Sequence, residues 1–228
     1  MPGPFYIRDA AASSRDAQFI IDAFDSTIPH LTAAGSAAQW GTELFSKKPS
    51  FGQAIRDAVA QSENFRDTGH GERVRTFVAE VEDDATGNGT LDDGLARRVD
   101  ELGKTYVSVG AVKLRDDHFA THMLSPKNLT PHVTAAMETG NFVFLDVLVA
   151  DHRVDERRKG VGAALVNEVK KYATDHGKAT IWIDCWAGGT GRLVQYYEDL
   201  GFEPVEDFEL PTRNNAMWQG KVFRMDLV

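Results

Sequence analysis

A short run of basic and small residues carries the strongest chemical signal in this sequence. It consists of Arg157, Arg158, Lys159, Gly160, Val161, Gly162 and Ala163. Glycines at the point where a loop becomes a helix let several backbone N–H groups converge on one anionic group. The helix N-terminus adds partial positive charge, and the basic side chains can supply further phosphate contacts. The run predicts a phosphate-binding turn, although a tight turn with a solvated basic face would use the same residue types.

Two nucleotide-binding folds also place glycines before a helix. A dinucleotide fold fits the spacing from Gly160 and Gly162 to Asp184, which would be the ribose-binding acid. However, a charged loop at 151–159 separates the glycines from the preceding strand, and Leu165 occupies the position of the third glycine. A mononucleotide P-loop requires Gly-Lys-Ser/Thr, which this run lacks. The sequence therefore disfavours both folds.

The elements that must position this turn follow from hydrophobic periodicity. Residues 141–150 are almost wholly apolar and predict a central strand buried on both faces, with Asp146 as its one interior charge. A helix over about 160–176, ended by Gly177, and a core strand over 179–187 come next. The strand, helix, strand order predicts a parallel pair.

The other elements are predicted from the same kinds of pattern. We expect strands at 5–8, 73–81, 105–114, 202–210 and 221–228, and helices beginning at Ser13 or Ser14, over about 50–61, and over 193–200. Leu95, Val99 and Leu102 have the spacing of a short amphipathic helix. Residues 83–94 predict an exposed loop, and 118–140 an irregular segment that could cover a substrate.

Three ordered stretches of the chain match motifs of one known family. Arg157–Ala163 matches the pattern Arg/Gln-x-x-Gly-x-Gly/Ala, and Leu145–Ala150 looks like a splayed strand that precedes it. Tyr197–Phe202 is similar to a second motif, a helix with a tyrosine followed by a Gly-Phe strand start. Ile7–Ala10 with Asp16 looks like the first strand and helix. Together these stretches resemble the GNAT acetyltransferase superfamily.

The resemblance implies a fold and a domain organisation. The fold is α/β (α+β), with a mixed, mostly antiparallel sheet of six to seven strands, a parallel splayed central pair, and helices on both faces. One acyltransferase domain would span residues 1–228, with insertions at about 83–102 and 118–140.

The resemblance also implies acetyl-CoA as cosubstrate. Its pyrophosphate would lie on the amides of 157–163, and its pantetheine arm would pair like a strand with Leu148, Val149 and Ala150. A pantetheine arm carries amide donors and acceptors that complement exposed backbone groups. Thr190 stands where the family commonly has a cofactor-contacting asparagine, and its hydroxyl can also form a hydrogen bond.

The implied reaction is direct attack of a primary amine on the thioester. The family motif makes Tyr197 the proton donor to the departing thiolate, although the same position suits a core residue of an amphipathic helix. Asp146 is our candidate base, because a carboxylate on a buried strand needs a partner or a shifted pKa, and an ammonium substrate would be such a partner. A structural carboxylate is the alternative, and Asp184 is the reserve candidate. Trp40 is a candidate wall of the acceptor pocket.

Two other functions remain open beside small-molecule N-acetylation. The first is a non-catalytic acyl-CoA-binding or scaffold domain, which the presence of Tyr197 mildly disfavours. The second is N-acetylation of proteins or peptides.

Several conspicuous residues receive a structural interpretation instead. His118, His122 and His132 lie in a segment with prolines and without a nearby glutamate or thiolate ligand, so we expect no metal, although one of them could contact substrate. We expect the single Cys185 and the neighbouring Trp182 and Trp186 to be core residues of a strand.

Composition limits the cellular context. In these 228 residues, 42% hydrophobic and 26% charged residues are typical of a globular protein. The net charge of -9 disfavours a nucleic-acid partner and mildly favours cationic substrates. A single cysteine, no signal segment and no membrane-spanning apolar run predict a cytoplasmic protein without a membrane partner, as a monomer or homodimer.

Overall fold

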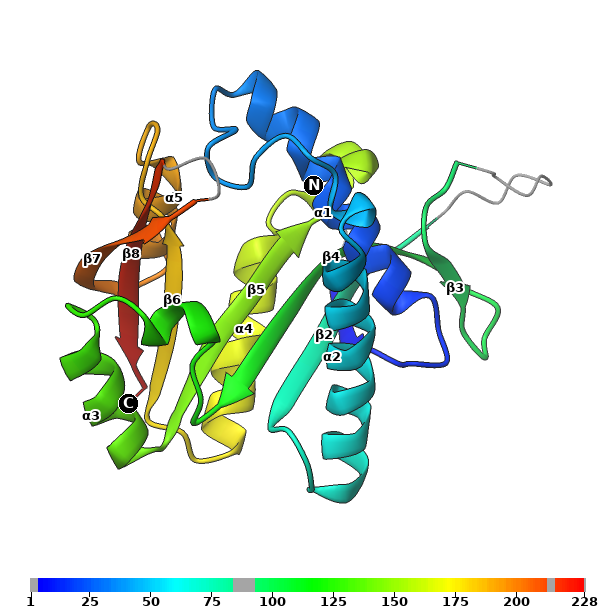
Figure 1. Ribbon diagram of the computed structural model, residues 1–228. Coiled ribbons are helices and arrows are strands. Elements are labelled where there is room, and N and C mark those ends of the chain that lie inside the picture. Colours follow the sequence, from blue (N-terminus) through cyan, green and yellow to red (C-terminus); the bar gives the residue numbers. More distant parts are fainter. Residues whose placement is uncertain (1–3, 84–92, 213–215, 228) are drawn as a thin grey trace. The chain divides into compact units, whose positions relative to one another are not determined.

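An eight-stranded sheet organises the chain in the computed structural model (Figure 1). The structure describes residues 4–83, 93–212 and 216–227. The strands are β1 Tyr6–Asp9, β2 Val74–Glu82, β3 Arg97–Val99, β4 Thr105–Asp116, β5 Phe142–Ala150, β6 Thr180–Trp186, β7 Glu203–Pro211 and β8 Met217–Asp226. Their order in the sheet is β1-β2-β4-β5-β6-β8-β7, with β3 paired to β4 beside this path.

Strand directions agree with the predicted mixed sheet. β5 and β6 are parallel, with Phe142–Leu145 in register with Thr180–Ile183. The pairs β1–β2, β3–β4, β6–β8 and β7–β8 are antiparallel. The prediction of a mostly antiparallel sheet with one parallel pair is confirmed, whereas the assignment of residues 1–228 to a single domain stays a prediction.

Five helices accompany the sheet in the described residues. They are α1 Asp16–Ala33, α2 Pro49–Thr68, α3 Thr130–Thr139, α4 Val161–Asp175 and α5 Arg192–Asp199, with short 3-10 turns η1 Phe45–Lys47, η2 Thr121–Leu124 and η3 His152–Arg158. None of these helices combines the length and the apolar character needed to cross a bilayer.

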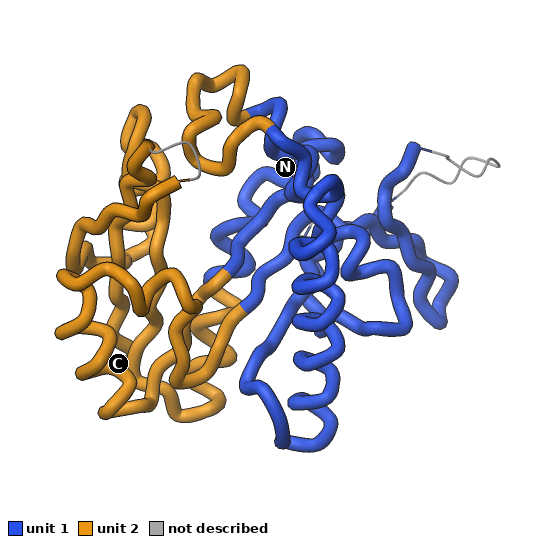
Figure 2. Tube along the Cα trace, in the orientation of Figure 1, with its two compact units in different colours: residues 1–30, 43–113, 147–166 blue, residues 31–42, 114–146, 167–228 orange. Residues whose placement is uncertain are grey.

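The chain divides into two compact units (Figure 2). Unit 1 comprises residues 1–30, 43–113 and 147–166, and unit 2 comprises residues 31–42, 114–146 and 167–228. The first part of β4 and the end of β5 belong to unit 1, while the end of β4 and the first part of β5 belong to unit 2.

Local signals account for the two long helices of unit 1. The hydroxyl of Ser14 accepts the backbone N–H of Asp16, the first residue of α1, at 3.1 Å, so the helix begins beside the predicted serine, with Arg15 at the N-cap position. α2 is longer than predicted and lies along β2 (Figure 1). The hydroxyl of Ser62 on α2 accepts the backbone N–H of Thr76 on β2 at 2.8 Å, so the helix is hydrogen-bonded to the sheet as well as packed on it.

The predicted short helix at 95–102 is wrong. Arg97–Val99 form β3, which pairs antiparallel with Thr105–Val107 of β4. Two of the three apolar residues that suggested a helical stripe are exposed, Val99 at 64% and Leu102 at 84%, and Leu95 is half-buried. Spacing alone gave the helical pattern, and pairing with β4 determines the structure. Residues 84–92 of the predicted loop at 83–94 lie outside the described residues.

The prediction of an irregular segment at 118–140 is also wrong in part. Residues 121–124 form η2, and Thr130–Thr139 form α3. Pro131, which suggested a chain break, lies in the first turn of α3, where its missing N–H costs no helical hydrogen bond. Gly140 follows the helix with a φ of 63°, a conformation that favours glycine.

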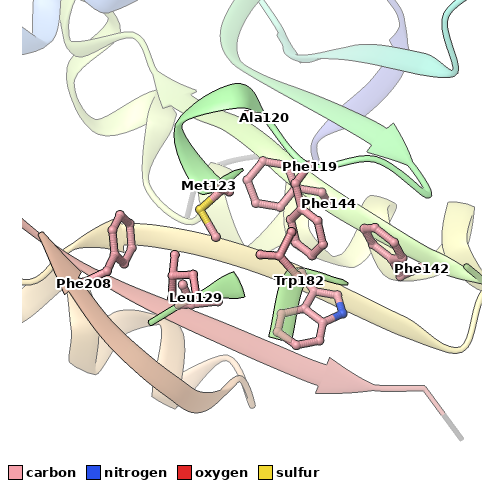
Figure 3. Packing of buried hydrophobic residues seen from close by; sticks show 10 residues of the cluster. Phe119, Ala120, Met123, Leu129, Phe142, Phe144, Trp182 and Phe208 are labelled. Carbon is pink, nitrogen blue, oxygen red and sulfur yellow. The ribbon is translucent and has the colours of Figure 1, made fainter. Parts of the chain in front are cut away.

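This segment packs on the sheet of unit 2 (Figure 3). The ring of Phe119 stacks on that of Phe142 at 4.7 Å between centroids and meets the edge of Trp182 at 5.7 Å. Met123 and Leu129 are buried in the same cluster. The segment is therefore a fixed layer of the core. Polar side chains that lie between these buried residues in the sequence are held in defined positions.

A buried carboxyl at the end of β4 should make stability pH-dependent. Asp116 is 6% exposed and accepts the hydroxyl of Tyr172 at 2.9 Å, but its Oδ1 has no hydrogen-bond partner in the described residues. Burial raises the pKa of Asp116, and the Tyr172 hydrogen bond and the charge of Lys178 offset this only partly. The folded pKa lies above the unfolded one, so the ionised carboxylate destabilises the fold as pH rises. Asp116→Asn should raise the free energy of unfolding by about 1 kcal/mol at pH 8, and by less at pH 5.

Urea unfolding at the two pH values measures this effect, and the neighbouring Asp117 gives a control of opposite sign. Burial opposes ionisation of Asp117, but hydrogen bonds from Lys178 and from the backbone of Phe142 lower its pKa. Asp117→Asn should therefore lose stability at pH 8, where the folded carboxylate is ionised and paired. A stability gain for Asp116→Asn that did not change between pH 5 and pH 8 would contradict the account.

Candidate active site

Unit 1 places the predicted phosphate-binding turn after β5, with η3 between the strand and Gly160. The backbone N–H of Asp151 donates to the carbonyl of Val109 at 2.9 Å, so β5 is bonded to β4 up to its end. The 3-10 turns of η3 follow, and within them Asp155 has a φ of 44°, which is uncommon for a residue with a side chain. The chain thus passes from strand to helix through a tightly folded connection.

The start of α4 leaves backbone donors available. Gly160 has a φ of 86°, and its carbonyl accepts the N–H of Ala164 at 3.1 Å, which is the first hydrogen bond of the helix. The amides of Val161, Gly162 and Ala163 precede that bond, and such amides have no acceptor within their own helix. They are the backbone donors for which the sequence predicted an anion, and their binding role stays a prediction.

The three basic residues before the helix differ in their partners. Arg157 forms an ion pair with Asp83 at 3.3 Å, and Lys159 with Glu156 at 2.5 Å. Arg158 has a buried Nε that lacks a hydrogen-bond partner in the described residues. A buried donor without an acceptor is costly, so an anion that accepts from Arg158 would stabilise the turn.

A buried carboxylate that sequence reasoning missed anchors the loop before the turn. Asp151 is 0% exposed and accepts the backbone N–H of Arg153 at 2.9 Å and its Nη2 at 2.7 Å. The ring of the next residue, His152, packs against that of His30 in a tilted arrangement, at 4.2 Å between centroids. Burial, with the nearby charge of Arg158, lowers the pKa of His152 to about 4, so this imidazole is neutral at physiological pH. An aspartate in a charged loop carries no sequence signal of burial.

Gly110 on β4 allows the end of β5 and the start of α4 to come close. A Cβ at this position would lie 3.0 Å from the carbonyl oxygen of Val149, 3.0 Å from Cγ2 of Val161 and 3.3 Å from Cδ1 of Leu165. Contacts of that length require the neighbours to shift, and one of them is backbone. Glycine is thus required where the turn is held against the sheet.

We expect Gly110→Ala to destabilise the protein by about 1–3 kcal/mol through overpacking, which lowers Tm by roughly 2–12 °C at this chain length. Thermal unfolding measures the change. Gly52→Ala in α2 is the matched control, because its Cβ would meet only ordinary contacts, the nearest being 3.4 Å from the flexible Arg56 side chain. That variant should be neutral or slightly stabilising. Equal losses of Tm in both variants would contradict the packing argument.

Unit 2 places Tyr197 in a buried position on α5. Its side chain is 5% exposed, and its ring contacts those of Phe202 and Phe223 at centroid distances of 5.9 and 6.1 Å. Burial, with smaller contributions from Cys185 and Asp184 among its neighbours, raises the pKa of Tyr197 well above the ordinary value. The hydroxyl therefore keeps its proton, as a hydrogen-bond or proton donor must.

Asp146 has a charged partner. Arg115 on β4 donates its Nε to Oδ2 of Asp146 at 2.7 Å, and the Asp146 side chain is 10% exposed. This ion pair corresponds to the structural alternative that the sequence left open, and it satisfies one oxygen of the carboxylate. The catalytic role of Asp146 stays a prediction.

The structure also brings together two residues that sequence reasoning kept apart. Nε2 of His122, in η2, lies 3.1 Å from Oδ1 of Asp184 on β6. Asp184 was a reserve candidate for the active site, whereas His122 was set aside with the other histidines of its segment. No local pattern distinguishes His122 from His118 or His132, because only the fold selects the one that meets a carboxylate.

The remaining candidates lie in turns of unit 2. Thr190 is exposed in the turn before α5. This turn is held against Trp186, since a Cβ at Gly188 would lie 2.6 Å from the indole ring. Trp40 is half-buried in the turn that follows α1, and the carbonyl of its neighbour Gln39 accepts the indole N–H of Trp218 at 2.9 Å.

A cavity of about 850 Å³ opens in unit 2. Its walls come from the 126–128 stretch, from the starts of the turn and helix after β6, and from β7 and β8. Charged residues on the wall are Lys127, Asp207, Glu209 and Lys221. Trp40 is not among the lining residues, whereas Pro126, Lys127 and Asn128 of the 118–140 segment are. In the part of the chain that the structure describes, no three metal-ligand side chains lie close enough to hold an ion.

The sequence profile of the Acetyltransferase (GNAT) family matches residues 60–202, which is more than half of the chain. The chain belongs to the GNAT acetyltransferase family. It is accordingly an acyl-CoA-dependent N-acetyltransferase. The matched span includes β5, the turn at Gly160 and Tyr197 on α5.

Solved structures share the GNAT fold at low sequence identity. A GNAT-family protein from Desulfovibrio desulfuricans has a TM-score of 0.57 and 14% identity, with 99% of this chain and 100% of that chain covered. A protein from Salmonella typhimurium solved with acetyl-CoA has a TM-score of 0.56 and 14% identity, covering 99% and 95%. A phosphinothricin acetyltransferase from Sinorhizobium meliloti, in complex with acetyl-CoA, has a TM-score of 0.54 and 15% identity, covering 98% and 88%. No curated protein sequence matches this GNAT chain.

Proposed function

We propose that this GNAT enzyme transfers an acetyl group from acetyl-CoA to the primary amine of a small molecule. The observation that carries the proposal is the start of α4, where three helix-terminal amides follow Arg158 closely in the sequence, and the buried Nε of Arg158 has no hydrogen-bond partner in the described residues. Both features suit a diphosphate. The acetyl-CoA in the structures from Salmonella typhimurium and Sinorhizobium meliloti supports the choice of anion.

Residues of unit 1 would hold the cosubstrate at its diphosphate and along its pantetheine arm. The amides of 161–163 and the side chain of Arg158 would hold the diphosphate, with Arg157 and Lys159 exchanging their present carboxylate partners for phosphate oxygens. The main chain of Leu148–Ala150, at the end of β5, would pair with the pantetheine amides. In unit 2, Thr190 would add a hydroxyl contact. When bound, acetyl-CoA supplies the acetyl thioester and a thiol leaving group.

The residues of unit 2 would serve the acceptor and the leaving group. Tyr197 retains its proton and would donate it toward the departing sulfur. The cavity of about 850 Å³ lies within the range of small-molecule sites, which favours a small acceptor. Lys221 is paired with Asp207 at 2.6 Å, and Glu209 adds a further carboxylate that can attract an ammonium group.

Calorimetric titration with acetyl-CoA and with CoA, followed by a thiol-release screen, tests this proposal. The screen should contain polyamines, amino sugars, amino acids and peptides. Binding together with turnover of a small amine is the expected result. Binding without turnover of any acceptor would favour a scaffold, and turnover of peptides alone would favour a protein or peptide acetyltransferase. Absence of binding would overturn the proposal.

A further inference from the structure

His122 is held in one place by its surroundings. It lies in η2 between Phe119 and Met123, which are 0% and 1% exposed in the core of unit 2. Its backbone carbonyl accepts the hydroxyl of Ser125 at 3.1 Å. The imidazole itself is 37% exposed, so its position is fixed while one side remains accessible.

We propose that His122 is the general base that takes a proton from the acceptor amine, with Asp184 as the residue that positions it. This inference rests on the proposed function, because it assigns a step of the same acetyl transfer. Neither the sequence motifs nor the charged residues on the predicted strands had indicated this catalytic residue.

The hydrogen bond to Asp184 fixes the tautomer of the imidazole. A carboxylate can only accept, so Nε2 of His122 must carry the hydrogen that bridges the 3.1 Å to Oδ1 of Asp184. Nδ1 then keeps the lone pair, and it has no hydrogen-bond partner among the described residues. A base with a free lone pair and an orienting carboxylate on its other nitrogen is the arrangement that proton abstraction requires.

Three neighbouring strands present charges to this imidazole. Asp184 faces it from β6, Asp146 from β5 and Arg115 from β4, and the Phe144 ring lies 6.5 Å away. Burial disfavours the imidazolium, but the hydrogen bond and charge of Asp184, with the charge of Asp146, outweigh it and raise the pKa of His122. The carboxylates thus stabilise the cation that forms when His122 accepts a proton.

The two carboxylates are less suitable as the base. Asp146 is ion-paired with Arg115 at 2.7 Å, and Asp184 is bonded to His122 and 11% exposed. His122 is the most exposed of these three groups. Asp146 and Asp184 therefore act through His122, as positioning and electrostatic residues.

The proton balance of the step is complete. A primary ammonium group loses two protons when it becomes an amide nitrogen. The first N–H bond breaks with its electron pair left on nitrogen, and the proton forms the Nδ1–H bond of His122. That pair forms the C–N bond to the acetyl carbon, while the C–S bond breaks and its pair leaves with sulfur. Tyr197 gives its hydroxyl proton to the departing sulfur. The second N–H bond breaks with its pair left on nitrogen, that proton restores the Tyr197 hydroxyl, and His122 returns the first proton to solvent.

The pH dependence of kcat/KM tests the assignment, because a merely structural histidine would not set it. The assay uses saturating acetyl-CoA and the amine with the highest turnover in the thiol-release screen. In wild type, kcat/KM should rise with pH along one limb of the pH profile, and the pKa of that limb should lie above that of an ordinary histidine. In His122→Gln this limb should disappear, and kcat/KM at pH 7.5 should fall by about 10²–10⁴-fold. Asp184→Asn should move the limb to lower pH, because the carboxylate that raises the pKa is gone.

His132→Gln is the matched control. His132 lies in the same segment, on α3, 3.8 Å from Glu206, and this substitution should leave both the limb and the rate unchanged. Thermal unfolding and acetyl-CoA titration of all variants show whether each is folded and binds its cosubstrate. An NMR titration of the His122 imidazole in wild type and Asp184→Asn provides a second measurement of the pKa shift without a substrate.

The outcomes separate this inference from the proposed function. If the enzyme is active but the rising limb persists in folded His122→Gln, the role of His122 is overturned and the proposed function stands. The same conclusion follows if His122 titrates with the same pKa in wild type and in Asp184→Asn. Failure of every acceptor in the screen would overturn the proposed function and, with it, this inference.

Discussion

Tyr197→Phe should lower kcat for acetyl transfer by about 10²–10⁴-fold while leaving acetyl-CoA affinity nearly unchanged. The substitution removes one hydroxyl from a side chain that is 5% exposed, and the remaining ring can keep its contacts with Phe202 and Phe223. Burial keeps the pKa of Tyr197 high, so the residue functions as a protonated group. The loss should therefore appear in the step that protonates the leaving sulfur. Steady-state kinetics with thiol detection, together with calorimetric titration, measures both quantities.

Tyr196→Phe is the control for this variant. Tyr196 is the adjacent residue on α5, half-buried, and its ring lies 5.4 Å from that of Tyr197. Removal of its hydroxyl makes the same chemical change one position away and should leave kcat within a few-fold of wild type. A wild-type rate in Tyr197→Phe, or equal losses in the two variants, would remove Tyr197 from the mechanism and return it to the role of a core residue.

The run from β5 to β6 could be predicted because short-range patterns determine it. The apolar stretch of β5 begins with Phe142, Val143, Phe144 and Leu145, all of which are buried as a central strand requires. Leu165 and Val169, four residues apart in the predicted stripe of α4, are both 0% exposed. Gly177 ends the helix with a φ of 65°. Each signal acts over a few residues, so no tertiary information was needed.

The errors occurred where pairing or packing determines the structure. β3 exists because Arg97–Val99 meet β4, and nothing within 95–102 distinguishes that strand from a helical repeat. α3 begins at a proline-containing turn that is equally compatible with a loop. In both cases the deciding contact comes from a distant part of the chain.

The candidate site divides in the same way. The turn at Gly160 and the position of Tyr197 belong to contiguous motifs, so the sequence indicated them. The pair His122–Asp184 joins residues 62 apart in sequence, and Arg115–Asp146 joins residues 31 apart. Spacing carries no information about such pairs, because only the alignment of strands and of the segment between β4 and β5 creates them.

Gly160→Val should weaken acetyl-CoA binding more than any other single substitution in the turn. Gly160 has a φ of 86°, where a β-branched residue is strained, so the chain should rotate away from this conformation. That rotation moves the amides of 161–163, which we propose as the diphosphate donors. Each hydrogen bond to a charged group contributes about 1.5–3 kcal/mol, so the loss of one raises Kd roughly 10- to 150-fold. Calorimetric titration with CoA isolates the effect from the acceptor.

Gly177→Val provides the matched control at the opposite end of the same helix. Gly177 also has a positive φ, 65°, and a Cβ there would meet no atom within 4 Å, so the substitution introduces comparable backbone strain without new contacts. Both variants should lose thermal stability, because both force a side chain into the left-handed region. Only Gly160→Val should lose affinity for CoA, since only its strain reaches the N-terminal amides. If CoA affinity fell equally in both, general destabilisation of α4 would explain the loss. If it fell in neither, the diphosphate would have to bind elsewhere.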